Sequence, residues 1–249
     1  MSDRTDSLIG VANALFAAAL TLLLLAMLVA AARLPVFDFR EVRVVGDVSR
    51  LTREQVALIV RREVRGNLFT ADLEPVRTAF EKLPWVRTAE VRRTWPPGLT
   101  VSVEEQTALA RWGDIGLVNT HGELFEAATD EDLPEFAGPA GASAEMAERY
   151  LEFSRLLQPL GTRIIQLTLS PRRAWEMRLD SGVLIALGRE RMAPRLERFV
   201  SVHSASVGTL AGRVRYVDLR YPNGFAARVP PQSRNPQNKM RNAGDKGKA

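Results

Sequence analysis

The sequence predicts an α+β protein with three successive parts: a single N-terminal transmembrane helix, a small domain of order β-α-α-β-β, and a second, antiparallel-rich β domain with helices. Three observations lead to this architecture. Residues 8–32 carry no charged side chain. Residues 37–106 alternate between strand-like and helix-like hydrophobic spacing, and residues 107–229 contain several short strand-like runs with two amphipathic segments between them.

The uncharged segment at residues 8–32 is long enough to cross a bilayer as a helix. At about 1.5 Å per residue, it exceeds the roughly 30 Å hydrocarbon core. A cleaved signal peptide is the alternative, because Ala30-Ala31-Ala32 offers small residues to a peptidase. Signal peptides, however, carry a shorter apolar run behind a basic leader. The leader here, residues 1–7, has two acidic residues and one basic residue, so an uncleaved anchor is favoured.

The charges around this segment do not determine its orientation. Arg4 precedes the span, whereas Arg33, Arg40 and Arg43 follow it. A simple positive-inside count would therefore place the C-terminal side in the cytoplasm. That rule governs short loops, and long domains are translocated largely regardless of charge. Composition alone leaves the orientation open.

Residues 37–106 are predicted to fold as β-α-α-β-β. Thr52, with Gln55 three residues later, has the pattern of a capping box at the start of the first helix. Asp72 is the predicted N-cap of the second helix, with Pro75 in its first turn. Strands are predicted at residues 41–45, 86–95 and 99–104.

Residues 107–229 are predicted to form a mixed β domain. Amphipathic helices are expected at residues 146–157 and 192–203, and Glu145 and Arg149 are predicted to pair on the outer face of the first. The following tail, residues 230–249, is polar and basic and is predicted to be disordered. Strands are predicted at residues 117–118, 124–125, 164–169, 175–179, 183–187, 213–220 and 225–229.

Charge and composition exclude several classes of function. The chain has 34 basic and 29 acidic residues, but five basic residues and one acidic residue fall in residues 230–249, so the remainder is close to neutral. This distribution argues against a basic groove for nucleic acid. Cysteine is absent, which excludes disulfides and thiolate chemistry. His121 and His203 are too few and too far apart to suggest a metal site.

No catalytic constellation is recognisable in the sequence. The motifs G-x-S-x-G, H-E-x-x-H, Walker A and G-x-G-x-x-G are absent. Glu104 and Glu105 are adjacent on a predicted strand, so their side chains should face opposite ways.

Arg172 and Arg173 follow Pro171 and could hold a phosphate or lie solvated in a turn. Core packing is preferred to a sugar-binding platform for Trp85, Trp95, Trp112 and Trp175. The functional candidates are therefore surfaces, and no enzymatic activity, cofactor or metal is predicted.

The order of the parts resembles the FtsQ/DivIB family of bacterial cell-division proteins. The resemblance covers roughly residues 8–229 and implies a POTRA domain at residues 37–106 and an FtsQ-type β domain at residues 107–229. Six short motifs carry it: Phe39-Arg40-Glu41-Val42-Arg43-Val44-Val45-Gly46, Leu83-Pro84-Trp85-Val86, Arg93-Thr94-Trp95-Pro96-Pro97, Ser170-Pro171-Arg172-Arg173-Ala174-Trp175, Leu187-Gly188-Arg189, and Tyr216-Val217-Asp218-Leu219-Arg220-Tyr221.

The resemblance implies a non-enzymatic scaffold of the divisome in the inner membrane, enriched at the septum. The leader would be cytoplasmic and the two domains periplasmic. A complex of FtsB and FtsL would bind the second domain, with an FtsB segment added as a strand beside residues 225–229, and other divisome proteins would contact the POTRA domain. The partner-binding residues that it implies are Arg172, Tyr221, Asn223, Gly224, Phe225, Ala226, Ala227, Arg228 and Val229.

The last predicted strand is suited to this role, because an edge strand has free backbone groups that can template another strand. Phe225, Ala227 and Val229 should face one way, and Ala226 and Arg228 the other. The sequence departs from some relatives at Pro222 and where Val229 and Pro230 replace a bulky aromatic.

There are two alternatives: a different POTRA-bearing envelope protein that handles secretion substrates, and a membrane-anchored cell-wall hydrolase. The first predicts a barrel or repeated POTRA units, and the second predicts clustered carboxylates or a nucleophile with a base. The sequence shows neither pattern.

Overall fold

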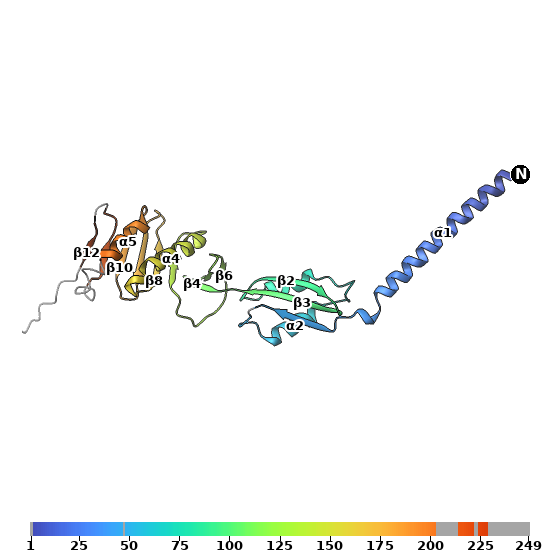
Figure 1. Ribbon diagram of the computed structural model, residues 1–249, viewed down its shortest axis with the longest axis horizontal. Coiled ribbons are helices and arrows are strands. Elements are labelled where there is room, and N and C mark those ends of the chain that lie inside the picture. Colours follow the sequence, from blue (N-terminus) through green and yellow to red (C-terminus); the bar gives the residue numbers. More distant parts are fainter. Residues whose placement is uncertain (1, 47, 203–213, 222–223, 229–249) are drawn as a thin grey trace, which may run out of the picture. The chain divides into compact units, whose positions relative to one another are not determined.

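The computed structural model describes residues 2–46, 48–202, 214–221 and 224–228, with side chains from residue 13 onward. The chain divides into two compact units, Met1–Gln106 and Thr107–Ala249 (Figure 1). His203 and the tail at residues 230–249, both considered above, lie outside the described residues.

The first unit begins with helix α1, Ser2–Ala32. Its stretch Asn13–Ala32 is long and apolar enough to cross a membrane, and none of it is buried within the protein. The hydroxyl of Thr21 donates to the backbone oxygen of Ala17 (2.8 Å), so this polar group has a partner within the helix itself. A short 3-10 turn, η1, follows at Pro35–Phe37.

The rest of the first unit has the predicted order β-α-α-β-β. The three-stranded sheet has the order β1-β3-β2, in which β3 pairs parallel with β1 and antiparallel with β2. Val76, Phe80 and Val101 are completely buried between this sheet and the helices. The elements are β1 Glu41–Val45, α2 Arg53–Glu63, α3 Glu74–Glu81, β2 Val86–Thr94 and β3 Gly98–Glu105.

The capping pattern in the sequence predicted the N-cap of α2 correctly, and it missed the N-cap of α3 by one residue. Thr52 and Gln55 form both bonds of the predicted capping box. The N-cap of α3 is Leu73, not Asp72, so that prediction was wrong. Asp72 instead accepts a hydrogen bond from the backbone N–H of Glu74 (3.1 Å), the short-range turn that aspartate readily makes.

The second unit contains a nine-stranded sheet of order β12-β11-β10-β9-β8-β7-β4-β5-β6 (Figure 1). Five of the eight strand pairs are antiparallel and three are parallel, so the sheet is mixed and antiparallel-rich. The elements are β4 Ala108–Trp112, β5 Gly116–Asn119, β6 Leu124–Phe125, β7 Glu135–Ala137, α4 Ser143–Leu157, η2 Gln158–Leu160, β8 Ile164–Leu169, β9 Trp175–Leu179, β10 Leu184–Gly188, α5 Met192–Val202, β11 Tyr216–Asp218 and β12 Ala226–Arg228.

Both helices of the second unit pack on the sheet around one hydrophobic core. Phe153 of α4 and Leu196 of α5 are completely buried in the same cluster as Phe136 of β7 and Ile185 of β10. The strands β4 and β7 were not predicted. β7 is only three residues long, too short to show an alternating pattern.

Two predictions about side chains in these units were wrong. Glu145 and Arg149 do not pair with each other: Glu145 binds Arg173 (2.6 Å), and Arg149 binds Glu152 (2.6 Å). Trp95 is 73% exposed, so it is not a core residue, whereas Trp112 and Trp175 are buried as predicted. The remaining tryptophan, Trp85, stacks beneath the guanidinium of Arg50 at 3.8 Å.

Candidate partner-binding edge

Strand β12 lies at one end of the nine-stranded sheet. It pairs antiparallel with β11, with Tyr216 opposite Arg228, Val217 opposite Ala227 and Asp218 opposite Ala226. Within the described part of the chain, no strand lies on its other side. The strand predicted at residues 225–229 therefore exists and is an edge strand; Val229 lies outside the described residues.

The ladder between β10 and β11 determines which backbone groups point outward. The N–H of Leu184 donates to the oxygen of Arg215 (3.0 Å), and the N–H of Leu219 donates to that of Ala186 (2.9 Å). Because backbone groups of successive residues alternate in direction, Val217 must also turn its N–H and C=O toward β10. Its neighbours Tyr216 and Asp218 consequently face β12.

The same alternation assigns the backbone groups of β12. The oxygen of Arg228 accepts from the N–H of Arg215 (3.1 Å), so Arg228 faces β11. Ala226, two residues earlier and opposite Asp218, faces β11 as well. Ala227, between them, directs its N–H and C=O to the open edge, where an added strand could bind them.

The side chains of β12 divide between the two faces of the sheet, as alternation predicts. The ring of Phe225 packs edge-on against Phe199 of α5, with 5.5 Å between ring centres. Ala227 lies on the same face and, with Phe225, borders an apolar hollow of about 190 Å³. The guanidinium of Arg228 lies 5.8 Å from the ring of Tyr216, its cross-strand neighbour on the opposite face. Phe225 thus contributes to the fold as well as to the candidate edge.

The turn before β12 contributes one exposed aromatic side chain. Tyr221 is 54% exposed directly after Arg220, and Gly224 is half-buried at the start of the last segment. Asn223, another predicted contact, lies with Pro222 outside the described residues.

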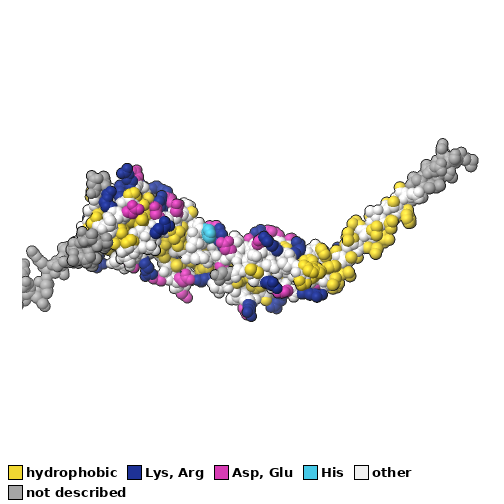
Figure 2. Space-filling model, in the orientation of Figure 1, with side chains coloured by type: hydrophobic (Ala, Val, Ile, Leu, Met, Phe, Trp, Pro, Cys, Tyr) yellow, Lys and Arg dark blue, Asp and Glu magenta, His cyan; other side chains and the backbone are white. Residues whose placement is uncertain are grey.

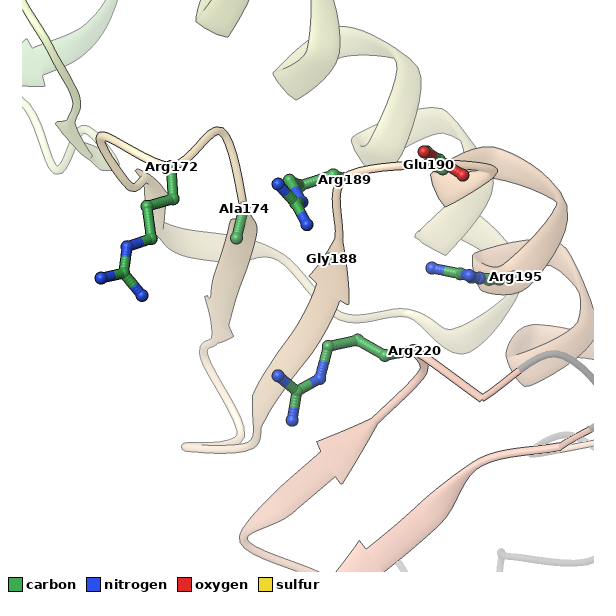
Figure 3. A pocket seen from close by; sticks show the side chains of 7 residues that line it. All are labelled: Arg172, Ala174, Gly188, Arg189, Glu190, Arg195 and Arg220. Atoms are coloured by element: carbon green, nitrogen blue, oxygen red, sulfur yellow. The ribbon is translucent and has the colours of Figure 1, made fainter.

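Arg172 lines a second feature of the same unit, a hollow of about 420 Å³ bordered by four arginines (Figure 3). Arg172 comes from the turn between β8 and β9, Arg189 from the end of β10, Arg195 from α5 and Arg220 from the segment after β11. Glu190 is the single carboxylate in the lining. The excess of guanidinium groups makes this hollow suited to anionic groups such as carboxylates. We name it the arginine hollow.

The turn at Pro171 separates two neighbouring arginines. Arg173 adopts a positive φ of 66° and donates to Glu145 of α4. Arg172, in contrast, lines the arginine hollow and has no hydrogen bond or ion pair among the described residues. The sequence left open whether these two arginines hold a ligand or lie solvated. In the structure, Arg173 forms an ion pair within the domain, and Arg172 is available for a ligand.

The arrangement of the arginine hollow depends on a buried carboxylate and on a glycine. Asp218 is buried, and both of its oxygens accept from Arg220, at 2.9 and 2.6 Å. Hydrogen bonding from Arg220 holds the pKa of Asp218 below its ordinary value, although burial opposes this shift. Gly188 has φ of 79°, and a Cβ there would lie 3.1 Å from Arg220 and 3.3 Å from Arg195. Glycine therefore allows the two arginines to approach β10.

Sequence reasoning singled out Arg172 but missed the other three arginines of the hollow. Arg189 and Arg220 were present in the motifs that carried the resemblance, yet neither was assigned a role. Arg195 lies on α5, and nothing in the helical pattern distinguishes it from a solvated arginine. Only the fold brings these four side chains together.

Among the described residues, no group of three or more histidine, aspartate or glutamate side chains is arranged to hold a metal ion. Glu104 and Glu105 bind different partners, as their adjacency on a strand predicts. Glu104 accepts from Arg87 (2.8 Å), and Glu105 accepts from the backbone of residues 49–51.

Two family models match this chain. The model described as cell division protein FtsQ/DivIB, C-terminal, matches residues 110–220, and the model described as POTRA domain, FtsQ-type, matches residues 37–106. The chain belongs to the FtsQ/DivIB family of cell-division proteins. Its first unit thus carries the POTRA domain, and its second unit is the FtsQ/DivIB C-terminal domain. With α1 as its apolar span, this FtsQ/DivIB member is a single-pass membrane protein of the division site.

Curated relatives cover most of the chain. The cell division protein FtsQ of Nitrosospira multiformis is 47% identical over 233 residues, which cover 92% of this chain and 99% of that protein. FtsQ of Burkholderia pseudomallei is 42% identical, covering 86% of this chain and 91% of its own. FtsQ of Bordetella pertussis is 37% identical, covering 92% of each chain. The C-terminal family model ends at residue 220, before β12.

Proposed function

We propose that this FtsQ/DivIB member is a non-enzymatic scaffold that recruits FtsB and FtsL, as a complex, to the division septum. An FtsB segment adds as a strand to β12 of the C-terminal domain. The observation that carries this proposal is the edge position of β12, whose ladder bonds imply that the N–H and C=O of Ala227 point outward. Strand addition at such an edge derives affinity from backbone hydrogen bonds and specificity from alternate side chains.

Charge complementarity supports a second contact with the same partner. The resemblance assigns Arg172 to an acidic part of FtsB, and Arg172 lines the arginine hollow with three further arginines. One of these, Arg220, directly precedes Tyr221 and lies eight residues before Arg228 in β12. A segment that pairs with β12 and continues past Tyr221 would bring its carboxylates toward these guanidinium groups.

Proline substitution tests the edge, because proline removes the N–H donor from one chosen position. Ala227→Pro removes an outward N–H and should abolish binding of purified FtsB–FtsL while far-UV circular dichroism stays that of wild type. Ala226→Pro is the matched control: its N–H faces β11, so it should disturb the parent sheet and lower thermal stability. Wild-type affinity in a well-folded Ala227→Pro protein would refute strand addition at β12.

Tyr221→Ala should weaken binding by about 2 kcal/mol, as expected for an exposed aromatic anchor at an interface. Phe225→Ala should also weaken binding, but it removes the contact with Phe199 and should therefore lower stability too. Affinity by titration calorimetry, together with thermal unfolding, separates these two effects.

Charge reversal tests the arginine hollow. Arg172→Glu should weaken FtsB–FtsL binding more at low than at high salt, because an exposed charge contact is screened by ions. Arg163→Glu is the control: Arg163 is 71% exposed, lies in the same unit, and is not in the hollow lining. Equal losses in both variants, or a loss independent of ionic strength, would contradict a specific contact at Arg172.

The proposed orientation has a cytoplasmic N-terminus and periplasmic domains. A reporter that is active only in the periplasm, fused after Val229, should be active and remain membrane-bound. Reporter activity in the cytoplasm, or release of a soluble protein, would refute this orientation.

A further inference from the structure

The end of the POTRA domain at which α1 enters carries large apolar side chains that the domain does not cover. Leu34 and Val36, directly after α1, are 50% and 54% exposed, and Phe69 and Trp95 are 59% and 73% exposed. Most exposed apolar residues of a soluble domain are scattered singly, so a group of four at one end requires an explanation. Figure 2 shows hydrophobic side chains along α1 and again on the part of this unit where α1 ends.

Hydrogen bonds and a ring contact bring these side chains from distant sequence positions to the same end of the domain. Phe69 packs edge-on against Phe37, with 4.9 Å between ring centres, and Leu68 N–H donates to the oxygen of Phe37 (3.0 Å). The turn that holds Trp95 is anchored nearby, because Arg40 N–H donates to the oxygen of Pro97 (2.9 Å).

The loop around residue 67 also binds the end of α1 itself. Asn67 is buried, and its Nδ2 donates to the oxygen of Ala32 (2.7 Å), one of the last carbonyls of the helix. Its Oδ1 accepts from the N–H groups of Phe69 and Thr70 at 3.1 and 3.2 Å. The amide of Asn67 thus joins the helix end to the loop that presents Phe69. Arg93 extends this connection to strand β2 by donating to the oxygen of Ala71 (2.6 Å).

We propose that this end of the POTRA domain, formed by Leu34, Val36, Phe69 and Trp95, inserts into the headgroup region of the bilayer that α1 spans. The occupant follows from chain continuity: Leu34 is two residues beyond the end of the membrane-spanning helix. Tryptophan favours the membrane interface, where its apolar ring system and its polar N–H can both be solvated. The domain is therefore held at the membrane by its surface as well as by its anchor.

The charged residues at this end are consistent with a lipid surface. Arg33, Arg40 and Arg65 are exposed, and none has a side-chain partner among the described residues. Guanidinium groups bind phosphate well, so these three side chains are suited to lipid headgroups. Acidic residues also lie nearby in the sequence: Asp38 and Glu41 flank Arg40, and Glu63 is two residues from Arg65.

The natural absence of cysteine permits a direct test with single reporters in the full-length protein. Phe69→Cys and Trp95→Cys, each labelled with a nitroxide and reconstituted in phosphatidylcholine–phosphatidylglycerol nanodiscs, report depth through collisions with oxygen and with a water-soluble nickel reagent. Val45→Cys is the control: Val45 is 47% exposed but lies four residues along β1 from Glu41, about 13 Å farther from this end.

The proposal predicts a higher ratio of oxygen to nickel collisions at positions 69 and 95 than at position 45. It also predicts that Arg40→Glu with Arg65→Glu lowers this ratio at position 69. Circular dichroism must match wild type in every variant. Nickel accessibility at both positions equal to that at position 45 would overturn the proposal. Protection of both labels from both reagents would overturn it too, because that result would mean that protein covers this end.

Discussion

Replacing Glu105 with alanine should destabilise the POTRA domain by about 2–4 kcal/mol. One carboxylate oxygen of Glu105 accepts from the N–H groups of Arg50 (2.8 Å) and Leu51 (3.1 Å), and the other accepts from the N–H and hydroxyl of Ser49 (3.0 and 3.1 Å). A hydrogen bond to a charged group is worth roughly 1.5–3 kcal/mol when its loss leaves the donor unsatisfied. These donors are partly exposed and would regain water, so a net of about 0.5–1 kcal/mol for each bond is appropriate.

Glu104→Ala is the matched control, because it removes the same side chain from the adjacent position of β3. Glu104 binds Arg87 (2.8 Å) in a pair whose side chains are 23% and 49% exposed, and it accepts a hydrogen bond from the hydroxyl of Thr88 (3.2 Å). An ion pair of this kind contributes about 0–1 kcal/mol. The structure therefore predicts a clear difference between two glutamates that the sequence cannot distinguish.

Hydrogen exchange of the full-length protein, followed by mass spectrometry, measures the effect in each domain separately. Peptides from the loop 48–52 and from α2 should exchange faster in Glu105→Ala, whereas peptides of the C-terminal domain should be unchanged. Equal exchange in Glu105→Ala and Glu104→Ala would show that the carboxylate does not hold the loop.

The same contact predicts a dependence of stability on pH. Burial tends to raise the pKa of Glu105, but the hydrogen bonds from residues 49–51 outweigh it and leave the pKa below its ordinary value. A carboxylate whose pKa is lowered by folding stabilises the folded state fully above its unfolded-state pKa, about 4.3 for glutamate. This stabilisation is lost as pH falls through the folded-state pKa. Glu105→Gln should remove this part of the acid sensitivity.

Three further predictions concern single residues of the two domains. Thr52→Ala should cost about 1 kcal/mol by removing one bond of the capping box, measured as faster exchange in the first turn of α2. Phe136→Ala should destabilise the C-terminal domain by about 3–5 kcal/mol, because the ring is completely buried; urea unfolding with an unchanged midpoint would contradict this. Asp218→Asn should remove stability that wild type has above about pH 4 and loses on acidification, because the bond to Arg220 lowers the pKa of Asp218. The urea midpoint should depend less on pH across that range in the variant than in wild type.

Features that depend on a few neighbouring residues could be predicted from the sequence. The capping box of Thr52 and Gln55 is set by a four-residue pattern, and the β-α-α-β-β order by hydrophobic spacing. The last strand was also predicted, from the turn signal before it and the alternation after it. Its edge position in the second domain was an expectation from the family resemblance, because hydrophobic pattern does not give strand order.

Features that depend on the fold could not be predicted. Trp95 alternates correctly with Ala89 and Val91, yet it lies beyond the end of β2, where no helix covers it. Glu145 prefers Arg173 to its helical neighbour because the turn after β8 places that guanidinium beside α4. The arginine hollow likewise needs β8, β10, α5 and β11 to be assembled before its four side chains line one hollow.

The order of strands in the C-terminal domain has a consequence for biosynthesis. β12 comes after every other strand of its sheet in the sequence, and it is also the strand at the edge. A chain interrupted between residues 220 and 226 could still pair β11 with β10, but its sheet would end at β11 and present the backbone of Tyr216 and Asp218 instead of Ala227. The complete edge exists only after the ribosome has passed residue 228, so a partner that binds it distinguishes chains that contain β12 from chains that stop before it.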